Sequence, residues 1–76
     1  MPAELVRNAT HDGRTVVLLR CYDGAEGQTV VEAQVTPVGG AAPVARGPYH
    51  FASAADGFRF VQEAVLALQY LGCTVS

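Results

Sequence analysis

The chain has 76 residues, half of them apolar and 16% charged, with a formal net charge of −2 at pH 7. This length fits a single domain, and the apolar content favours a folded globule over intrinsic disorder. All five positive charges are arginines, spread along the sequence rather than gathered. General binding to nucleic acid, which needs clustered cations, is therefore disfavoured.

The first residues, MPAELVRN, contain no apolar run of signal-peptide length, and no stretch reaches the roughly 18 apolar residues of a membrane span. We therefore expect a cytosolic, bacterial protein that does not enter a membrane. Cys21 and Cys73 lie far apart without C-x-x-C spacing. They are expected to be free thiols in a reducing compartment.

Residues 1–10 are predicted to be either loose or an edge strand, because ELVRNAT precedes Asp12-Gly13, a good hairpin turn. A better-defined hairpin follows, with strands at 15–22 and 28–37 around the Gly-bearing connection DGAEG. If Cys21 faces Thr29 and Leu19 faces Val31, every odd position is small or apolar. The odd residues are therefore predicted to form the core face of the sheet.

Residues 37–48 contain three prolines and three glycines, so this segment is predicted to be a loop. The next residues, 49–52, have the composition of a short strand with Tyr49 and Phe51 on one face.

Ser53 is expected to cap a helix, in a capping box with Asp56, and Gly72 to end it in a left-handed conformation. Gly57 is expected to weaken the first turn. The predicted core stripe of the helix consists of Phe60, Val61, Ala64, Ala67, Leu68 and Leu71. Leu66 and Tyr70 fall on the opposite side, beside Arg59 and Glu63.

These elements predict a single α+β domain, an antiparallel meander of three or four strands with one C-terminal helix on its odd-residue face. Such layouts host many functions, so the fold alone assigns none.

No residue pattern predicts catalysis or a bound cofactor. His11 beside Asp12, with His50 elsewhere, is interpreted as a polar turn rather than a metal site or a general base. Cys21 is placed on the core face, and Cys73 lies at the negative end of the helix dipole. Neither position favours a thiolate, and Gly39-Gly40 lacks the spacing of a phosphate-binding loop.

The predicted fold has more apolar side chains than a single helix and sheet can bury, and this indicates a function in binding. A lone helix cannot cover both sheet faces, so a monomer would leave apolar side chains exposed. The sequence therefore predicts a non-catalytic interaction or regulatory domain that binds itself, as a homodimer, or another protein. The predicted interface residues, on the open sheet face and on the outer side of the helix, are Val16, Leu18, Arg20, Tyr22, Val30, Leu66 and Tyr70. The alternative is nucleic-acid binding by the open sheet face through Arg14, Arg20 and Tyr22.

Overall fold

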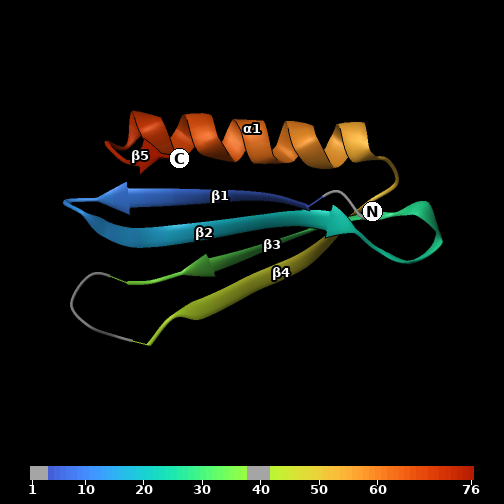
Figure 1. The fold of residues 1–76 in the computed structure, drawn as a ribbon, viewed down its shortest axis with the longest axis horizontal. Coiled ribbons are helices and arrows are strands. Elements are labelled where there is room, and N and C mark those ends of the chain that lie inside the picture. The colour runs from blue at the N-terminus through green and yellow to red at the C-terminus, as the bar shows by residue number, and fades with distance from the viewer. Residues whose placement is uncertain (1–3, 38–41) are drawn as a thin grey trace.

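The computed structural model describes residues 4–37 and 42–76. It has two layers, an antiparallel sheet and an α-helix that runs along one of its faces (Figure 1). The elements are β1 (Glu4–His11), β2 (Arg14–Asp23), the short 3-10 helix η1 (Ala25–Gly27), β3 (Thr29–Val35), β4 (Val44–Phe51), α1 (Ala54–Tyr70) and β5 (Thr74–Val75). The α+β class is as predicted.

The sheet has five strands in the order β4-β3-β2-β1-β5, so the predicted number of three or four was too low. The first four strands form the predicted meander. The added strand, β5, follows the helix and pairs with the second half of β1 through Ala9–Val75 and Thr10–Thr74. A strand of two residues carries no alternating pattern, which is why β5 was not predicted.

The register between β2 and β3 differs from the predicted one by two residues. Cys21 faces Val31 and Leu19 faces Ala33. A shift of two keeps every side chain on its own face, so the odd residues do form the core face, as predicted. The shift arises at the connection, where β2 continues to Asp23 and the Gly24 N–H bonds the Gln28 carbonyl at 2.7 Å.

Strand β4 begins at Val44 and so takes in the last residues of the predicted 37–48 loop. The strand continues through Gly47 and Pro48 because its ladder with β3 shifts register there, between Val31 and Ala33. Residues 38–41 of the predicted loop lie outside the described residues. Beyond the shift, Tyr49 and Phe51 both stack on Phe60 of the helix, with ring centroids 5.4 and 5.3 Å apart.

Helix α1 has both predicted ends. The Ser53 side chain accepts a hydrogen bond from the Asp56 N–H at 3.2 Å, as an N-cap does. At the other end Gly72 has a φ of 97°, and the Cys73 N–H bonds the Leu68 carbonyl at 2.9 Å. This is the Schellman arrangement, which a glycine at that position permits.

The buried stripe of α1 is rotated by a fraction of a turn from the predicted one. Val61 is buried, and Phe60, Ala64, Val65 and Leu68 pack around it against the core residues of the sheet. Ala67 and Leu71, assigned to the core by sequence, are exposed; Leu71 follows the last helical residue. Val65, which was not assigned to the core, packs against it instead.

Gly57 has a role that composition does not reveal. It is buried, and a Cβ on it would lie 2.6 Å from the Thr29 side-chain methyl. The glycine therefore lets the first turn of α1 approach β3 closely, instead of merely weakening that turn.

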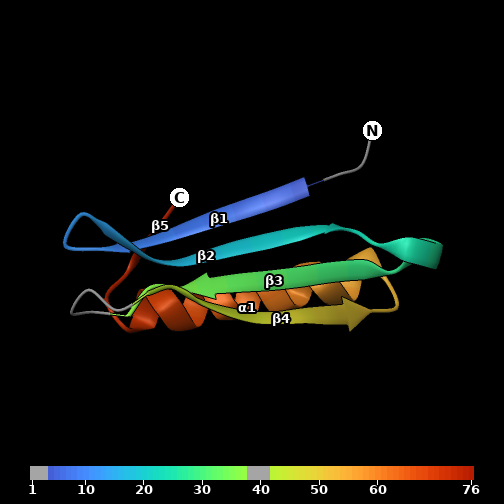
Figure 2. The same ribbon diagram turned by 90° about the horizontal axis from the view of Figure 1, so that it is seen from below.

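The helix covers only part of the sheet. In Figure 2, α1 lies behind β3 and β4, and the first half of β1 lies off to one side. One helix is about 10 Å wide and strands are about 4.8 Å apart, so it can cover two or three of five strands. The molecule is accordingly long and thin, 39 × 24 × 19 Å. No helix in the described part of the chain has the length and apolarity needed to cross a lipid bilayer.

Candidate interaction surface

The outer side of α1 carries large apolar side chains in contact with solvent. Leu66 is 64% exposed, Tyr70 90% and Leu71 73%. The helical wheel placed Leu66 and Tyr70 on this side, and Leu71 is also exposed because it follows the last helical residue. These three residues, from the last two turns and the C-cap of the helix, are called the helix patch below.

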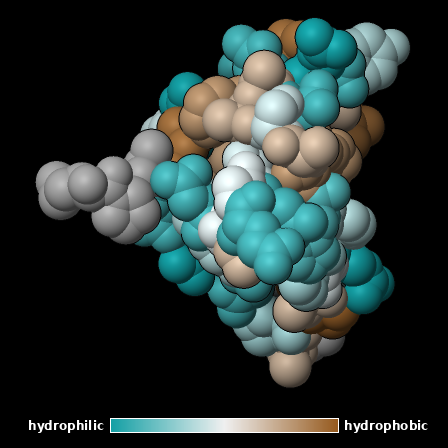
Figure 3. All heavy atoms as spheres, turned by 90° about the vertical axis from the view of Figure 1, so that its right-hand side faces the viewer, coloured by the Kyte–Doolittle hydropathy of each residue, from teal (hydrophilic) through white to brown (hydrophobic). Residues whose placement is uncertain are grey.

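A groove separates α1 from the uncovered part of β1. It has a volume of about 460 Å³. Its lining residues are Leu5, Arg7, Arg59, Val61, Gln62, Glu63, Val65 and Leu66. The floor is apolar, and charged side chains of both signs stand around it. Viewed along the strands, brown apolar atoms come to the surface between the helix and the sheet (Figure 3).

The outer edge of β1 next to this groove has free backbone groups. The Asn8 N–H and carbonyl bond Ser76, at 3.1 and 3.0 Å, so they point away from β2. Backbone groups alternate along a strand, so those of Val6 and Glu4 point to the same side. Within the described residues β5 ends before reaching them, which leaves this edge from Glu4 to Arg7 open.

The other edge of the sheet is protected. Strand β4 contains Pro48, which has no N–H to donate, together with the register shift beside Gly47 and the exposed charge of Arg46. Proline, irregular pairing and charge are the devices that keep an edge strand from pairing with another chain. Among the described residues, the β1 edge from Glu4 to Arg7 carries the charges of Glu4 and Arg7 but has no proline, and its register shift lies further along, between Ala9 and Thr10.

The open face of the sheet is more polar than expected. Arg20 donates to the Glu4 carboxylate at 2.7 and 3.2 Å and stands 4.0 Å from Glu32. The Tyr22 hydroxyl donates to Glu32 at 2.7 Å, and the Arg20 guanidinium lies over the Tyr22 ring. The hydrogen bond to Glu32 is the main cause that raises the pKa of Tyr22. Arg20 and Tyr22 are thus engaged with each other and with two carboxylates.

The apolar residues predicted on this face are largely covered. Val30 is only 5% exposed, so its assignment to an open interface was wrong. The connection folds back over it, and a Cβ on Gly24 would lie 2.6 Å from a Val30 methyl. Val16 and Leu18 are half-buried. Leu18 borders a shallow hollow of about 330 Å³ whose other lining residues include Arg20, Glu32 and Gln34.

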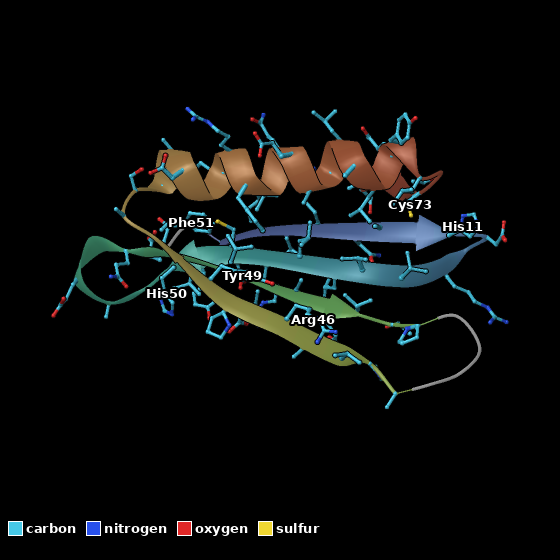
Figure 4. All side chains as sticks on the ribbon, turned by 180° about the vertical axis from the view of Figure 1, so that it is seen from behind. His11, Arg46, Tyr49, His50, Phe51 and Cys73 are labelled. Atoms are coloured by element: carbon cyan, nitrogen blue, oxygen red, sulfur yellow. The ribbon has the colours of Figure 1, made fainter. Side chains whose placement is uncertain are left out.

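The histidines and cysteines do not converge. His11 stands at the β1–β2 turn, whereas His50 lies toward the other end of the sheet and points away from the helix (Figure 4). His11 approaches Asp12 to 3.6 Å, with both side chains largely in solvent.

Cys21 and Cys73 are free thiols, and burial raises the pKa of Cys21. Within residues 4–37 and 42–76 no group of three or more His, Cys, Asp or Glu side chains is placed to hold a metal ion.

The residues of the predicted interface therefore differ in how accessible they are to a partner. The helix patch keeps Leu66 and Tyr70, while the open face loses Val30 and has its polar residues paired internally. Sequence reasoning missed the groove floor, chiefly Leu5 and Val65. Val65 follows Val61 by one helical turn, and this spacing could have indicated that both face the sheet. The exposure of Leu5 on β1 could not be predicted, because it depends on where the helix crosses the sheet.

Comparison of the chain with protein-family models, with curated proteins and with solved structures finds no match.

Proposed function

We propose that this protein is a small non-catalytic interaction domain that self-associates as a homodimer through the side of the molecule formed by the helix patch and the β1 groove. Its free cysteines agree with a reducing compartment such as the cytosol.

The observation that carries the proposal is the exposure of large apolar side chains near the end of the helix. Leu66, Tyr70 and Leu71 are exposed by 64%, 90% and 73%. A leucine that a partner buries fully contributes about 1.5–3 kcal/mol to association. A second copy that covers these side chains would therefore supply stabilisation that a lone chain lacks.

The location follows from the character of the two faces. On the helix side, Leu66, Tyr70 and Leu71 are all more than half exposed. On the open sheet face, the polar side chains are bonded to one another and the apolar ones are half-buried or buried. Large exposed apolar side chains mark candidate interaction sites, so the helix side is the better candidate.

Nucleic-acid binding by the open face is not supported in the same way. Its central cation, Arg20, is bonded to Glu4 and stands near Glu32. Two carboxylates beside one guanidinium make a surface that repels phosphate.

Light scattering at micromolar concentrations tests the proposal. The expected mass is twice the 8.0 kDa of one chain. Leu66→Glu is expected to raise the dissociation constant at least about tenfold, since losing one buried leucine costs at least about 1.5 kcal/mol. The matched control is Ala55→Glu, which adds the same charge at an exposed position in the first turn of the helix, about 16 Å along the helix from Leu66.

Leu18→Glu distinguishes the two faces. It is expected to leave the dimer intact, with circular dichroism used to verify that each variant folds. A wild-type protein that stays monomeric at all accessible concentrations would refute the proposal. A dimer that Leu18→Glu dissociates and Leu66→Glu does not would move the contact to the open face.

A further inference from the structure

We propose that two copies of this chain join edge to edge through β1, antiparallel across a two-fold axis at Leu5, so that each copy's Leu5 lies against the groove of the other. This inference rests on the proposed self-association and specifies its geometry: the contact is centred on the groove, and Tyr70 and Leu71, at the β5 end of the helix, lie outside it.

The backbone supplies the first argument. The amide and carbonyl groups of Glu4 and Val6 point outward at an edge that no described strand covers. An antiparallel partner strand satisfies these groups by main-chain hydrogen bonds, the mode of recognition called strand addition. Because the β4 edge is protected by Pro48 and its irregular pairing, addition at β1 closes after two copies and does not continue into a fibre.

The position of β5 selects the register. Asn8 is already bonded to Ser76, so a partner strand has free β1 groups only before that residue. Both copies must keep their helices on the same face, which requires odd residues opposite odd residues. One arrangement uses no backbone group that is already bonded. It places Glu4 opposite Val6 of the second copy and Leu5 opposite Leu5 of the second copy.

The side chains fit this register. Leu5 packs toward the core and lines the groove with Val61, Val65 and Leu66, so a second Leu5 beside it extends an apolar floor. On the open face the two Glu4 carboxylates come near each other across the axis. Their repulsion is reduced because each is bonded to its own Arg20, at 2.7 Å. Exposed Val6, which is 46% exposed, is covered by the same contact.

Disulfide trapping tests the register. In an antiparallel pair, opposite residues that do not exchange hydrogen bonds have Cα atoms about 4.5 Å apart, within the range that a disulfide spans. Leu5→Cys in a Cys73→Ser background is therefore expected to form a covalent dimer under mild oxidation. The matched control is Arg7→Cys in the same background. It lies on the same face of the same strand, but its two copies would be about 14 Å apart along the strands and are expected not to cross-link.

Amide hydrogen exchange on the unmodified chain gives an independent readout that no substitution can disturb. The Glu4 and Val6 amides are expected to become protected as concentration rises through the dimer range. A dimeric mass with no Leu5→Cys cross-link and unprotected amides would overturn this geometry and leave the proposed function standing. Preferential cross-linking of Arg7→Cys would overturn the register. A monomeric mass at every concentration would refute both proposals.

Discussion

Because α1 approaches β3 closely at Gly57, we predict that Gly57→Ala lowers the stability of the protein, although the same change usually stabilises a helix. At an exposed position in a helix this change stabilises by about 1 kcal/mol. Here the added Cβ would lie 2.6 Å from the Thr29 methyl, 3.3 Å from its Cβ and 3.6 Å from the Cys21 sulfur. The first distance is impossible without movement, whereas the last is ordinary contact.

The expected result is a net loss of stability. Overpacking a filled core costs about 1–3 kcal/mol, which exceeds the gain in helix propensity by about 1 kcal/mol on average. In urea denaturation of a small domain, with a slope of about 1 kcal/mol per molar, the midpoint should fall by about 1 M. All variants must be compared at one protein concentration, because the proposed dimer makes stability depend on it.

A double-mutant cycle isolates the contact. Thr29→Ser removes the methyl that meets the new Cβ and keeps the hydroxyl. In that background Gly57→Ala is expected to be neutral or to stabilise by up to about 1 kcal/mol, because the steric clash is gone and the higher helix propensity of alanine remains. If Gly57→Ala stabilises the otherwise unchanged protein, the helix does not approach β3 as described, and the reasoning fails.

Three further outcomes are expected. Ser53→Ala should cost about 1 kcal/mol in thermal or urea unfolding, and Ser53→Asp, which keeps an N-cap acceptor, only a few tenths; equal losses would argue against the cap. In the native protein a thiol reagent should label Cys73 and spare Cys21, whose pKa is raised by burial; labelling of both without unfolding would contradict the buried position. Tyr22 donates to Glu32, so its pKa lies above the ordinary value of 10.0. The associated stabilisation should be complete below that value and be lost as pH rises through the raised pKa. Glu32→Ala, which removes the acceptor, should bring the Tyr22 ionisation, followed by tyrosinate absorbance, to lower pH; an unchanged titration would exclude the hydrogen bond as its cause.

The sheet was predictable in its faces and not in its pairing. Alternation along β2 and β3 places Leu19, Cys21 and Val31 together whichever even shift the strands adopt. The choice between registers two residues apart was made by the connection, where Gly24 bonds Gln28, and no periodic signal reports that bond. For the same reason β5 escaped detection. Its pairing is stabilised by β1, more than sixty residues earlier in the sequence, and not by a pattern of its own.

Part of the candidate surface could likewise be predicted from the sequence and part could not. Exposure of Leu66 and Tyr70 follows from helical geometry alone, so the sequence was sufficient. Val30 was misplaced because its cover is a glycine, Gly24, whose lack of a side chain allows the turn to close over it. The groove beside Leu5 depends on the line that α1 takes across the sheet. Tertiary packing sets that line.

The pairing of β5 with β1 also bears on how the domain is assembled during synthesis. Asn8 and Ser76 are joined by main-chain hydrogen bonds in both directions, so the last strand of the structure completes one of the first. Contacts between residues so distant in sequence slow folding, because a long loop must close before they form. While the C-terminal part is still being translated, β1 has β2 as a neighbour on one side and nothing from β5 on the other. The nascent chain should therefore be most prone to aggregation in the interval when the meander has formed and β5 has not yet docked.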